Sequence, residues 1–211
     1  MELNQRRLFP EGSFWPHLQI EDSLLRQGYQ AIAGVDEAGR GPLAGPVVAA
    51  AVILPPDISL PGVRDSKRVP EQKREILYDQ IFSKARGIGI GVTEALQIDA
   101  INILQATFKA MIQAIQCLPC IPDYVLVDGN LKIPMVLPQR PLVGGDNLSL
   151  SIAAASIVAK VYRDRIMRKF HVLYPQYLFH KNKGYGSSKH LQALKQHGPC
   201  PIHRRSFRGV C

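Results

Sequence analysis

The chain has 211 residues, of which 46% are hydrophobic and 20% charged, and its formal net charge is +9. This composition and length are those of one globular domain, which excludes a disordered chain and a small fold that depends on disulfides. No apolar run approaches the roughly 20 residues that span a bilayer, and residues 1–10 lack the apolar stretch of a signal peptide. We therefore expect a cytoplasmic protein with no membrane partner.

Short apolar segments alternate with segments of helical periodicity. Such strands are too hydrophobic to be half solvated, which favours an α/β sheet with helices on both faces. No internal repeat or linker interrupts the pattern, so we expect one domain over 31–211, preceded by a lead-in over 1–30. In chain order, the pattern predicts a helix over 20–27, strands over 31–35 and 46–54, a helix over 70–82, a strand over 87–93, a helix over 98–116, a strand over 124–127 and helices over 149–170 and 188–197.

Positive charge is concentrated at the C-terminal end. The last 52 residues hold twelve of the 26 Lys and Arg residues and a single acid, Asp164. Such a block commonly marks a surface that binds a polyanion, although a solvated basic surface is the alternative. Aromatic residues interleaved with the cations could stack on bases, which favours a nucleic acid as the partner. These residues are Phe170, Tyr174, Tyr177, Phe179, Tyr185 and Phe207.

The four cysteines are too few for a disulfide scaffold. Cys117 and Cys120 have the CxxC spacing, and Cys200 lies three residues before His203. Together these residues could be two halves of a zinc site, about 80 residues apart in the sequence. Ordinary reduced thiols in a cytosolic protein are the interpretation that we favour.

Carboxylates follow two of the predicted strands. Asp36 and Glu37 come after the first strand, and Asp128 comes after the strand over 124–127. If these strands are parallel neighbours, the carboxylates meet at one edge of the sheet, where open α/β folds place their sites. Three carboxylates this close would repel one another unless a cation lay between them, and Mg²⁺ or Mn²⁺ prefers oxygen ligands. One acid after a strand is usually a turn residue, but three of them indicate a metal site.

Asp146, just ahead of the long helix, is a fourth candidate. The positive end of the helix dipole would favour its ionised form, and a plain helix cap is the alternative interpretation. Asp164 lies about 27 Å further along the same helix and cannot join the site. We expect Asp164 to pair with Lys160 or Arg168 on the helix surface.

A glycine-rich turn, Gly39-Arg40-Gly41, follows the first acids. A dinucleotide-binding loop would open a helix, whereas a β-branched apolar run follows Pro46, so that interpretation is rejected. Two glycines let the backbone approach a ligand closely, and Arg40 adds positive charge. We expect this turn to contact the backbone or sugar of a nucleic acid beside the metal site.

These motifs resemble those of the bacterial ribonuclease HII family. The stretch from Gly34 to Val48 is similar to the opening motif of that family, and further matches follow in the same order to about residue 210. The other matching segments are Asp65-Ser66-Lys67, Val127-Asp128-Gly129, Gly145-Asp146, 151–161, Arg163-Asp164, 174–177, 182–186, His190 and 203–207.

The resemblance implies an RNase H-like fold, with a mixed central sheet flanked by helices and a helical, basic C-terminal region. The implied activity is endonucleolytic hydrolysis of RNA paired with DNA, and nicking 5′ of single ribonucleotides embedded in duplex DNA, which leaves 5′-phosphate and 3′-hydroxyl ends. Two Mg²⁺ or Mn²⁺ ions would flank the scissile phosphate, one activating water and the other stabilising the leaving oxygen. We expect a monomer, since nothing in the sequence demands more.

The resemblance also assigns roles to ten residues. Asp36 is the best candidate to bridge both ions, and the glycine-arginine-glycine turn would sense the ribonucleotide 2′-hydroxyl. Gly145 stands where many members of the family carry lysine, so one phosphate contact is expected to be absent. The implied metal-binding and catalytic acids are Asp36, Glu37, Asp128 and Asp146, and the implied substrate-binding residues are Gly39, Arg40, Gly41, Ser66, Lys67 and Tyr185.

Two alternatives are weighed against this interpretation. The ribonuclease HIII branch shares the fold and metals but carries an extra N-terminal domain, for which the thirty residues before the first strand are too few. A non-catalytic nucleic-acid binder on the same fold would need a broken acid set, whereas all four positions here are acidic.

Overall fold

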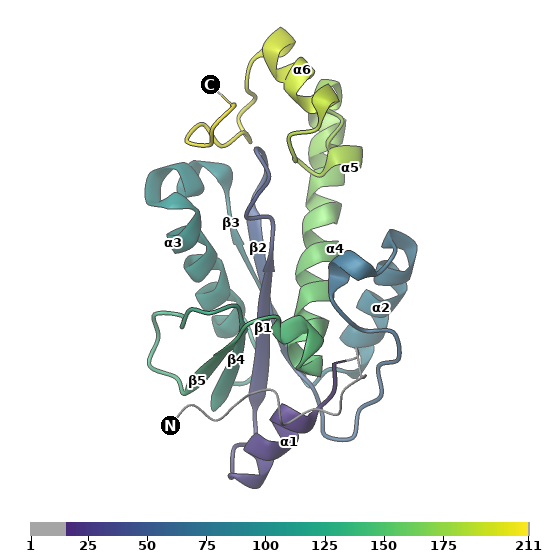
Figure 1. The fold of residues 1–211 in the computed structure, drawn as a ribbon, viewed down its shortest axis with the longest axis vertical. Coiled ribbons are helices and arrows are strands. Elements are labelled where there is room, and N and C mark those ends of the chain that lie inside the picture. The colour runs from purple at the N-terminus through teal and green to yellow at the C-terminus, as the bar shows by residue number, and fades with distance from the viewer. Residues whose placement is uncertain (1–15, 211) are drawn as a thin grey trace.

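A five-stranded sheet lies at the centre of the computed structural model, which describes residues 16–210. Its strand order is β3-β2-β1-β4-β5 (Figure 1). Strand β2 is antiparallel to β1 and β3, whereas β4 is parallel to β1 and β5, so the expected mixed sheet is confirmed. The strands are β1 (Ile32–Ala38), β2 (Val47–Ile53), β3 (Gly87–Thr93), β4 (Tyr124–Asp128) and β5 (Gln139–Leu142).

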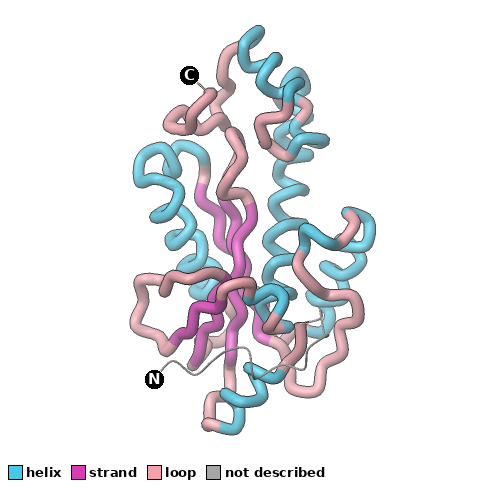
Figure 2. Tube along the Cα trace, viewed as in Figure 1, coloured by secondary structure: helices cyan, strands magenta, loops and turns pink. Residues whose placement is uncertain are grey.

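Helices cover both faces of the sheet, as Figure 2 shows by the position of the helical segments on either side of the strands. Helix α3 lies on one face, and α4 with α2 lies on the other. Helices α5 and α6 and the C-terminal end gather at the end of the molecule opposite α1 (Figure 1). The helices of eight or more residues are α1 (Gln19–Arg26), α2 (Glu71–Lys84), α3 (Ala95–Gln116), α4 (Leu150–Leu173) and α6 (Ser188–His197), and α5 is Phe179–Asn182.

Glycines in the strands let the helices pack closely on the sheet. A Cβ atom on Gly34 in β1 would lie 2.2 Å from the carbonyl carbon of Ser151 in α4. A Cβ atom on Gly89 in β3 would lie 1.9 Å from the carbonyl oxygen of Ala114 in α3. Both contacts are with helix backbone, which cannot move aside as a side chain can, so these positions require glycine.

The ends of most elements differ from the sequence prediction by one to three residues, and two differences matter for the sheet and the site. Strand β1 continues to Ala38, so Asp36 and Glu37 lie inside the strand and not after it, because both residues still pair with β2. Strand β5 was not expected, since Pro141 and polar neighbours hide its apolar pattern. Its position at the edge of the sheet tolerates proline, which lacks the N–H group of an inner strand.

The surroundings of Asp164 correct another prediction. Its Oδ1 lies 2.6 Å from Nζ of Lys160, which confirms that pairing, but only 2% of the Asp164 side chain is exposed. Arg74 of α2 lies 3.6 Å from the second oxygen, and Arg168 pairs with Glu75 instead. The predicted surface location is wrong because α2 packs over this side of α4.

The aromatic residues of the basic end differ in how deeply they are buried. Tyr177 and Phe179 are almost fully buried and form a small core with Met167 and Leu194, so the prediction that they stack on bases is wrong. The short C-terminal elements need an apolar core of their own, and these rings provide it. Tyr185 differs, because 50% of it is exposed.

Helix α1 packs into the main domain. Ile20 and Leu24 contact a cluster that includes Ile152 of α4, and Oε1 of the buried Glu21 accepts hydrogen bonds from both the N–H and the hydroxyl of Ser151. The predicted boundary at residue 31 stays a prediction, and residues 1–15 of the lead-in lie outside the described residues. None of the described helices is long and apolar enough to cross a membrane.

Candidate active site

The four predicted acids lie at one edge of the sheet, near the C-terminal ends of the parallel strands β1 and β4. The parallel pairing of Val35 with Val127 places the next residues of the two strands, Asp36 and Asp128, side by side. Oδ1 of Asp128 accepts a hydrogen bond of 2.8 Å from the N–H of Gly145, which draws in the turn that carries Asp146. Three segments distant in sequence therefore converge at this edge.

Burial and mutual repulsion perturb these carboxyl groups. Burial, followed by the charges of Glu37 and Asp128, raises the pKa of Asp36 well above its ordinary value. Burial and the charge of Asp128 raise the pKa of Asp146 to about 6. Burial also raises the pKa values of Glu37 and Asp128. The ionised forms of these four carboxyl groups are therefore disfavoured, because the groups are buried and lie close to one another.

Lys67 is a cation whose charge interacts with four carboxyl groups of this region. Partial burial lowers the pKa of Lys67, but the charges of Asp65, Asp36, Asp146 and Asp128 together outweigh this and raise it. Lys67 therefore carries a firm positive charge that offsets part of the repulsion.

Each acid also accepts a local hydrogen bond. Oδ1 of Asp36 accepts from the N–H of Glu37 at 2.7 Å, and Oδ1 of Asp146 accepts from the side-chain amide of Asn147 at 2.7 Å. Glu37 lies 3.4 Å from the guanidinium of Arg40. Within residues 16–210, no three His, Cys, Asp or Glu side chains are arranged around one point as metal ligands. Carboxylates that repel one another settle on local donors, so these side chains would have to turn to share an ion.

The predicted substrate-binding residues meet in one cleft of about 370 Å³. A Cβ atom added to Gly41 would lie 3.6 Å from the Tyr185 ring, so the glycine-rich turn and the tyrosine are neighbours in its lining. Asp128 and Asp146 do not line the cleft. The lining residues are Asp36, Glu37, Ala38, Gly39, Arg40, Gly41, Ser66, Lys67, Ser156, Lys160, Arg163 and Tyr185.

Three lining residues from α4 were not predicted as site residues: Ser156, Lys160 and Arg163. Their spacing of four and three residues places them on one side of the helix, which is the signal that could have found them. The hydroxyl of Ser156 donates to that of Ser66 at 3.0 Å, and Ser156 lies close enough to Asp36 to lower the pKa of its carboxyl group. This links the predicted serine to the acids.

Asp146 is not the cap of the long helix. It lies in a short 3₁₀ turn (Gly145–Asn147), and the hydroxyl of Ser149 accepts the hydrogen bond from Ile152 N–H that caps α4. The helix-cap interpretation is therefore wrong, and the Asp146 carboxylate has no capping role.

Two other interpretations of the sequence can be compared with the structure. The loop after Ala38 leads into strand β2 and not into a helix, which confirms that it is not a dinucleotide-binding loop. Cys117 and Cys120 are exposed just beyond α3, whereas Cys200 is buried with its sulfur 3.1 Å from Nδ1 of His203.

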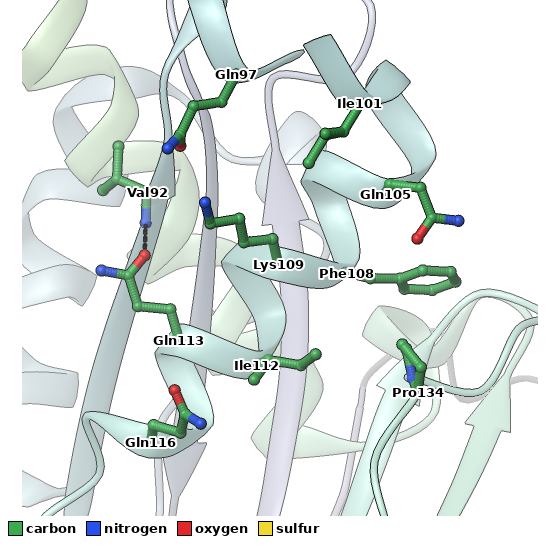
Figure 3. Close-up of a pocket in the computed structure, with 10 residues that line it drawn as sticks. All are labelled: Val92, Gln97, Ile101, Gln105, Phe108, Lys109, Ile112, Gln113, Gln116 and Pro134. Carbon is green, nitrogen blue, oxygen red and sulfur yellow. Dashed lines mark hydrogen bonds between the residues drawn. The ribbon is translucent and has the colours of Figure 1, made fainter.

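A larger depression, of about 720 Å³, lies on the outer side of α3 (Figure 3). Lys109 is the only charged residue of its lining, and Gln113 is tied to the backbone N–H of Val92. This lining shares no residue with the acid-lined cleft and offers no carboxylate, so we place the candidate site at the smaller cleft.

A buried histidine pair supports the segment that carries Tyr185. Nδ1 of His190 lies 2.8 Å from the carbonyl oxygen of Tyr185, and Nε2 of His190 lies 3.0 Å from Nε2 of His203. The N–H of Cys200 donates to Nδ1 of His203 at 3.0 Å. Neutral rings satisfy this chain when His190 donates to Tyr185 and His203 donates to His190. Protonating either ring would set two N–H groups against each other.

We expect this pair to lower the stability of the protein in acid. Burial and the neighbouring His190 lower the pKa of His203 to about 4. Between that pH and about 6.5, His203 therefore binds a proton in the unfolded chain but not in the folded chain. The free energy of unfolding therefore falls as pH drops through this window, by about 1.4 kcal/mol per pH unit for one proton. Urea unfolding from pH 7 to pH 5 measures it. A profile of His203→Gln parallel to that of the wild type would contradict it.

Comparisons with known proteins identify the family of this chain. Residues 33–210 match the family model of ribonuclease HII. Ribonuclease HII of Geotalea uraniireducens is 55% identical over 92% of this chain and 89% of its own, and that of Geotalea daltonii is 57% identical over 92% and 91%. The crystal structure of ribonuclease H2 from Pyrococcus horikoshii has a TM-score of 0.71 and 25% identity, over 86% of this chain and 95% of its own.

The fold expected from the motifs is confirmed by these similarities, since the related structure shares the sheet and its flanking helices. The family model covers the acids, the glycine-rich turn and the basic C-terminal end alike. The chain belongs to the ribonuclease HII family and is a ribonuclease H, an endonuclease that acts on RNA–DNA hybrids.

Proposed function

We propose that this protein uses the acid-lined cleft to hydrolyse the phosphodiester on the 5′ side of a ribonucleotide, including a single ribonucleotide embedded in duplex DNA. The observation that carries this proposal is the shared lining: Asp36 and Glu37 border the same 370 Å³ cleft as Gly41 and Tyr185. A carboxylate site for phosphodiester chemistry thus adjoins a surface that is able to contact one sugar. This adjacency suits an enzyme that cuts beside a chosen nucleotide.

The chemistry of the four acids suits two divalent cations, toward which their side chains would have to turn. Their donors are all carboxylate oxygens, which Mg²⁺ and Mn²⁺ prefer, and burial together with the charges of neighbouring acids raises the pKa values of Asp36 and Asp146, a penalty that bound positive charge would relieve. When bound, such ions supply activation of water and stabilisation of the leaving oxygen. The residues that would hold them are Asp36, Glu37, Asp128 and Asp146.

The other lining residues would bind and orient the substrate. The backbone of the glycine-rich turn would reach a 2′-hydroxyl, the group that distinguishes RNA from DNA, on the side where a Cβ atom on Gly41 would meet the Tyr185 ring. The Tyr185 ring would pack against the sugar next to it. A Cβ atom on Gly39 would instead lie 2.0 Å from Nε of the buried Arg163, so glycine at position 39 lets the turn pack on that side chain. Ser66 and Lys67 would bind a phosphate, and Lys67 carries the charge for this.

The test is to incubate a DNA duplex containing one ribonucleotide with the protein and Mg²⁺ or Mn²⁺, and to map the nick. We expect a single cut 5′ of the ribonucleotide, with 3′-hydroxyl and 5′-phosphate ends, and none in an all-DNA duplex. Binding without cleavage would favour the non-catalytic alternative, and a cut elsewhere would refute the proposed specificity.

Affinity should fall steeply between about 50 and about 200 mM salt, because phosphate contacts release counterions.

Tyr185→Ala should reduce cleavage at a single embedded ribonucleotide by about tenfold or more. The exposed ring stands against Gly41, and removing it leaves the sugar without a surface worth about 1–3 kcal/mol. Steady-state rates on that duplex measure the effect. Tyr185→Phe is the control, since it keeps the ring and should stay within a few-fold of the wild type. Wild-type rates in the alanine variant would exclude the ring from substrate binding.

A further inference from the structure

Two arginines are buried beneath the glycine-rich turn. Arg163 of α4 is 1% exposed and Arg204 of the C-terminal segment is 0% exposed. Neither forms an ion pair with a carboxylate in the described part of the chain. Burying two like charges is costly, and burial together with Arg163 lowers the pKa of Arg204 to about 9. Their donors must therefore be satisfied by neutral acceptors.

Main-chain carbonyl groups of the turn are those acceptors for Arg204. Its guanidinium spans the turn from below and also stacks over the ring of Phe207 at 5.0 Å. Its N–H groups donate to the carbonyl oxygens of Gly39 at 2.6 Å, Arg40 at 2.9 Å, Pro42 at 2.8 Å and Gly45 at 3.0 Å.

Arg163 links the same turn to the segment that carries Tyr185. It donates to the carbonyl oxygens of Ala44 at 3.1 Å and Pro46 at 2.9 Å, and to that of Lys183 at 2.9 Å. Lys183 lies two residues before Tyr185. Arg163 thus helps to set the separation between the turn and the tyrosine ring.

The direction of these hydrogen bonds determines where the turn points its N–H groups. In a trans peptide the C=O of one residue and the N–H of the next point in opposite directions, and residues 16–210 contain no cis peptide. Arg204 holds the carbonyls of Gly39 and Arg40, so the N–H groups of Arg40 and Gly41 point away from it. No backbone hydrogen bond within the described chain uses either of these N–H groups.

We propose that Arg204 is a positioning residue for ribonucleotide recognition, which aims the N–H groups of Arg40 and Gly41 at the substrate sugar, with Arg163 fixing the turn against the Tyr185 wall. This inference rests on the proposed function. Arg204 itself does not touch the substrate, because it is fully buried beneath the turn. Its contribution is to selectivity for the 2′-hydroxyl and not to general affinity for phosphates.

Arg204→Lys is the informative variant. Lysine keeps the positive charge but donates from a single nitrogen and cannot span four carbonyl groups. The measurement is the dissociation constant, without divalent metal, for a duplex with one ribonucleotide and for the all-DNA duplex of the same sequence. We expect the preference for the ribonucleotide to fall by about tenfold, the worth of one good hydrogen bond, with little change for DNA.

Arg205→Gln is the matched control. Arg205 is the exposed neighbour of Arg204, so its loss should weaken both duplexes alike and leave the preference intact. Equal weakening of both duplexes by Arg204→Lys would show a merely structural role and overturn the inference. If Arg204→Lys does not fold, Arg163→Lys carries the same test with the same expected loss of preference, and an unchanged preference there also overturns it.

The wild-type protein separates the two possible failures. No preference for the ribonucleotide in the wild type would refute the proposed function itself. A clear preference in the wild type that survives in both lysine variants would refute only the positioning role of the buried arginines.

Discussion

Replacing Asp36 by asparagine is expected to abolish cleavage, by about a thousandfold or more, while substrate binding is kept. Asp36 lines the cleft with Glu37, feels the charge of Asp128, and is one of the acids that would hold the cations, a role in which it has no neutral substitute. Asparagine keeps the size of the side chain and its ability to accept the hydrogen bond from Glu37 N–H. Cleavage rates and dissociation constants on one duplex measure the two effects. Undiminished turnover would remove Asp36 from catalysis.

The same substitution should stabilise the protein when no divalent metal is present. The folded-state pKa of Asp36 is raised above the value of about 3.8 in the unfolded chain, so ionising it at neutral pH opposes folding. That cost is fully present above the folded-state pKa and disappears as pH falls toward 3.8. We therefore expect Asp36→Asn to raise the thermal midpoint at pH 7 in a chelator, and to do so less in acid.

Asp164→Asn is the matched control for this stability effect. Asp164 is as deeply buried as Asp36, but its partners are the cations Lys160 and Arg74 instead of other acids. Its neutralisation breaks a buried ion pair and should cost about 3 kcal/mol. Opposite signs for the two substitutions would support the acid crowding, whereas a loss of stability in both would contradict it.

Gly34→Ala is expected to destabilise the fold by about 3 kcal/mol or more. The added methyl group would lie 2.2 Å from the Ser151 carbonyl carbon and 2.3 Å from the Ile152 nitrogen, and both atoms belong to the backbone of α4. The helix would have to lift off β1, carrying Ser156 away from Asp36. Chemical denaturation measures the loss.

Gly87→Ala is the control for this prediction. It also lies in a strand, but its methyl group would meet side chains and no backbone: the ring carbons of Pro119 at 3.0 Å and Cδ2 of Leu118 at 3.6 Å. We expect a cost below about 1 kcal/mol. Similar losses at Gly34 and Gly87 would show that the close approach of α4 to β1 is not what requires glycine.

Local patterns in the sequence were enough to predict several parts of this protein. The alternation of glycine with Ile and Val predicted β3 with its exact limits, and the apolar run before Asp128 predicted β4 to within one residue. The four acids and the glycine-rich turn were also proposed this way as site residues, and their roles stay predictions. Periodicity and motif spacing are properties of neighbouring residues, which is why they can be read without the fold.

Contacts between distant segments decided the rest. Strand β5 exists because β4 offers it an edge, and Asp164 is buried because α2 covers it, although neither fact has a local signal. The same holds for Arg204, which resembles its exposed neighbours in a basic block but lies under a turn 160 residues earlier in the chain. The sequence by itself determined which side chains were available for chemistry. Only the tertiary structure decided which of them meet, because burial and hydrogen-bond partners depend on residues far apart in the chain.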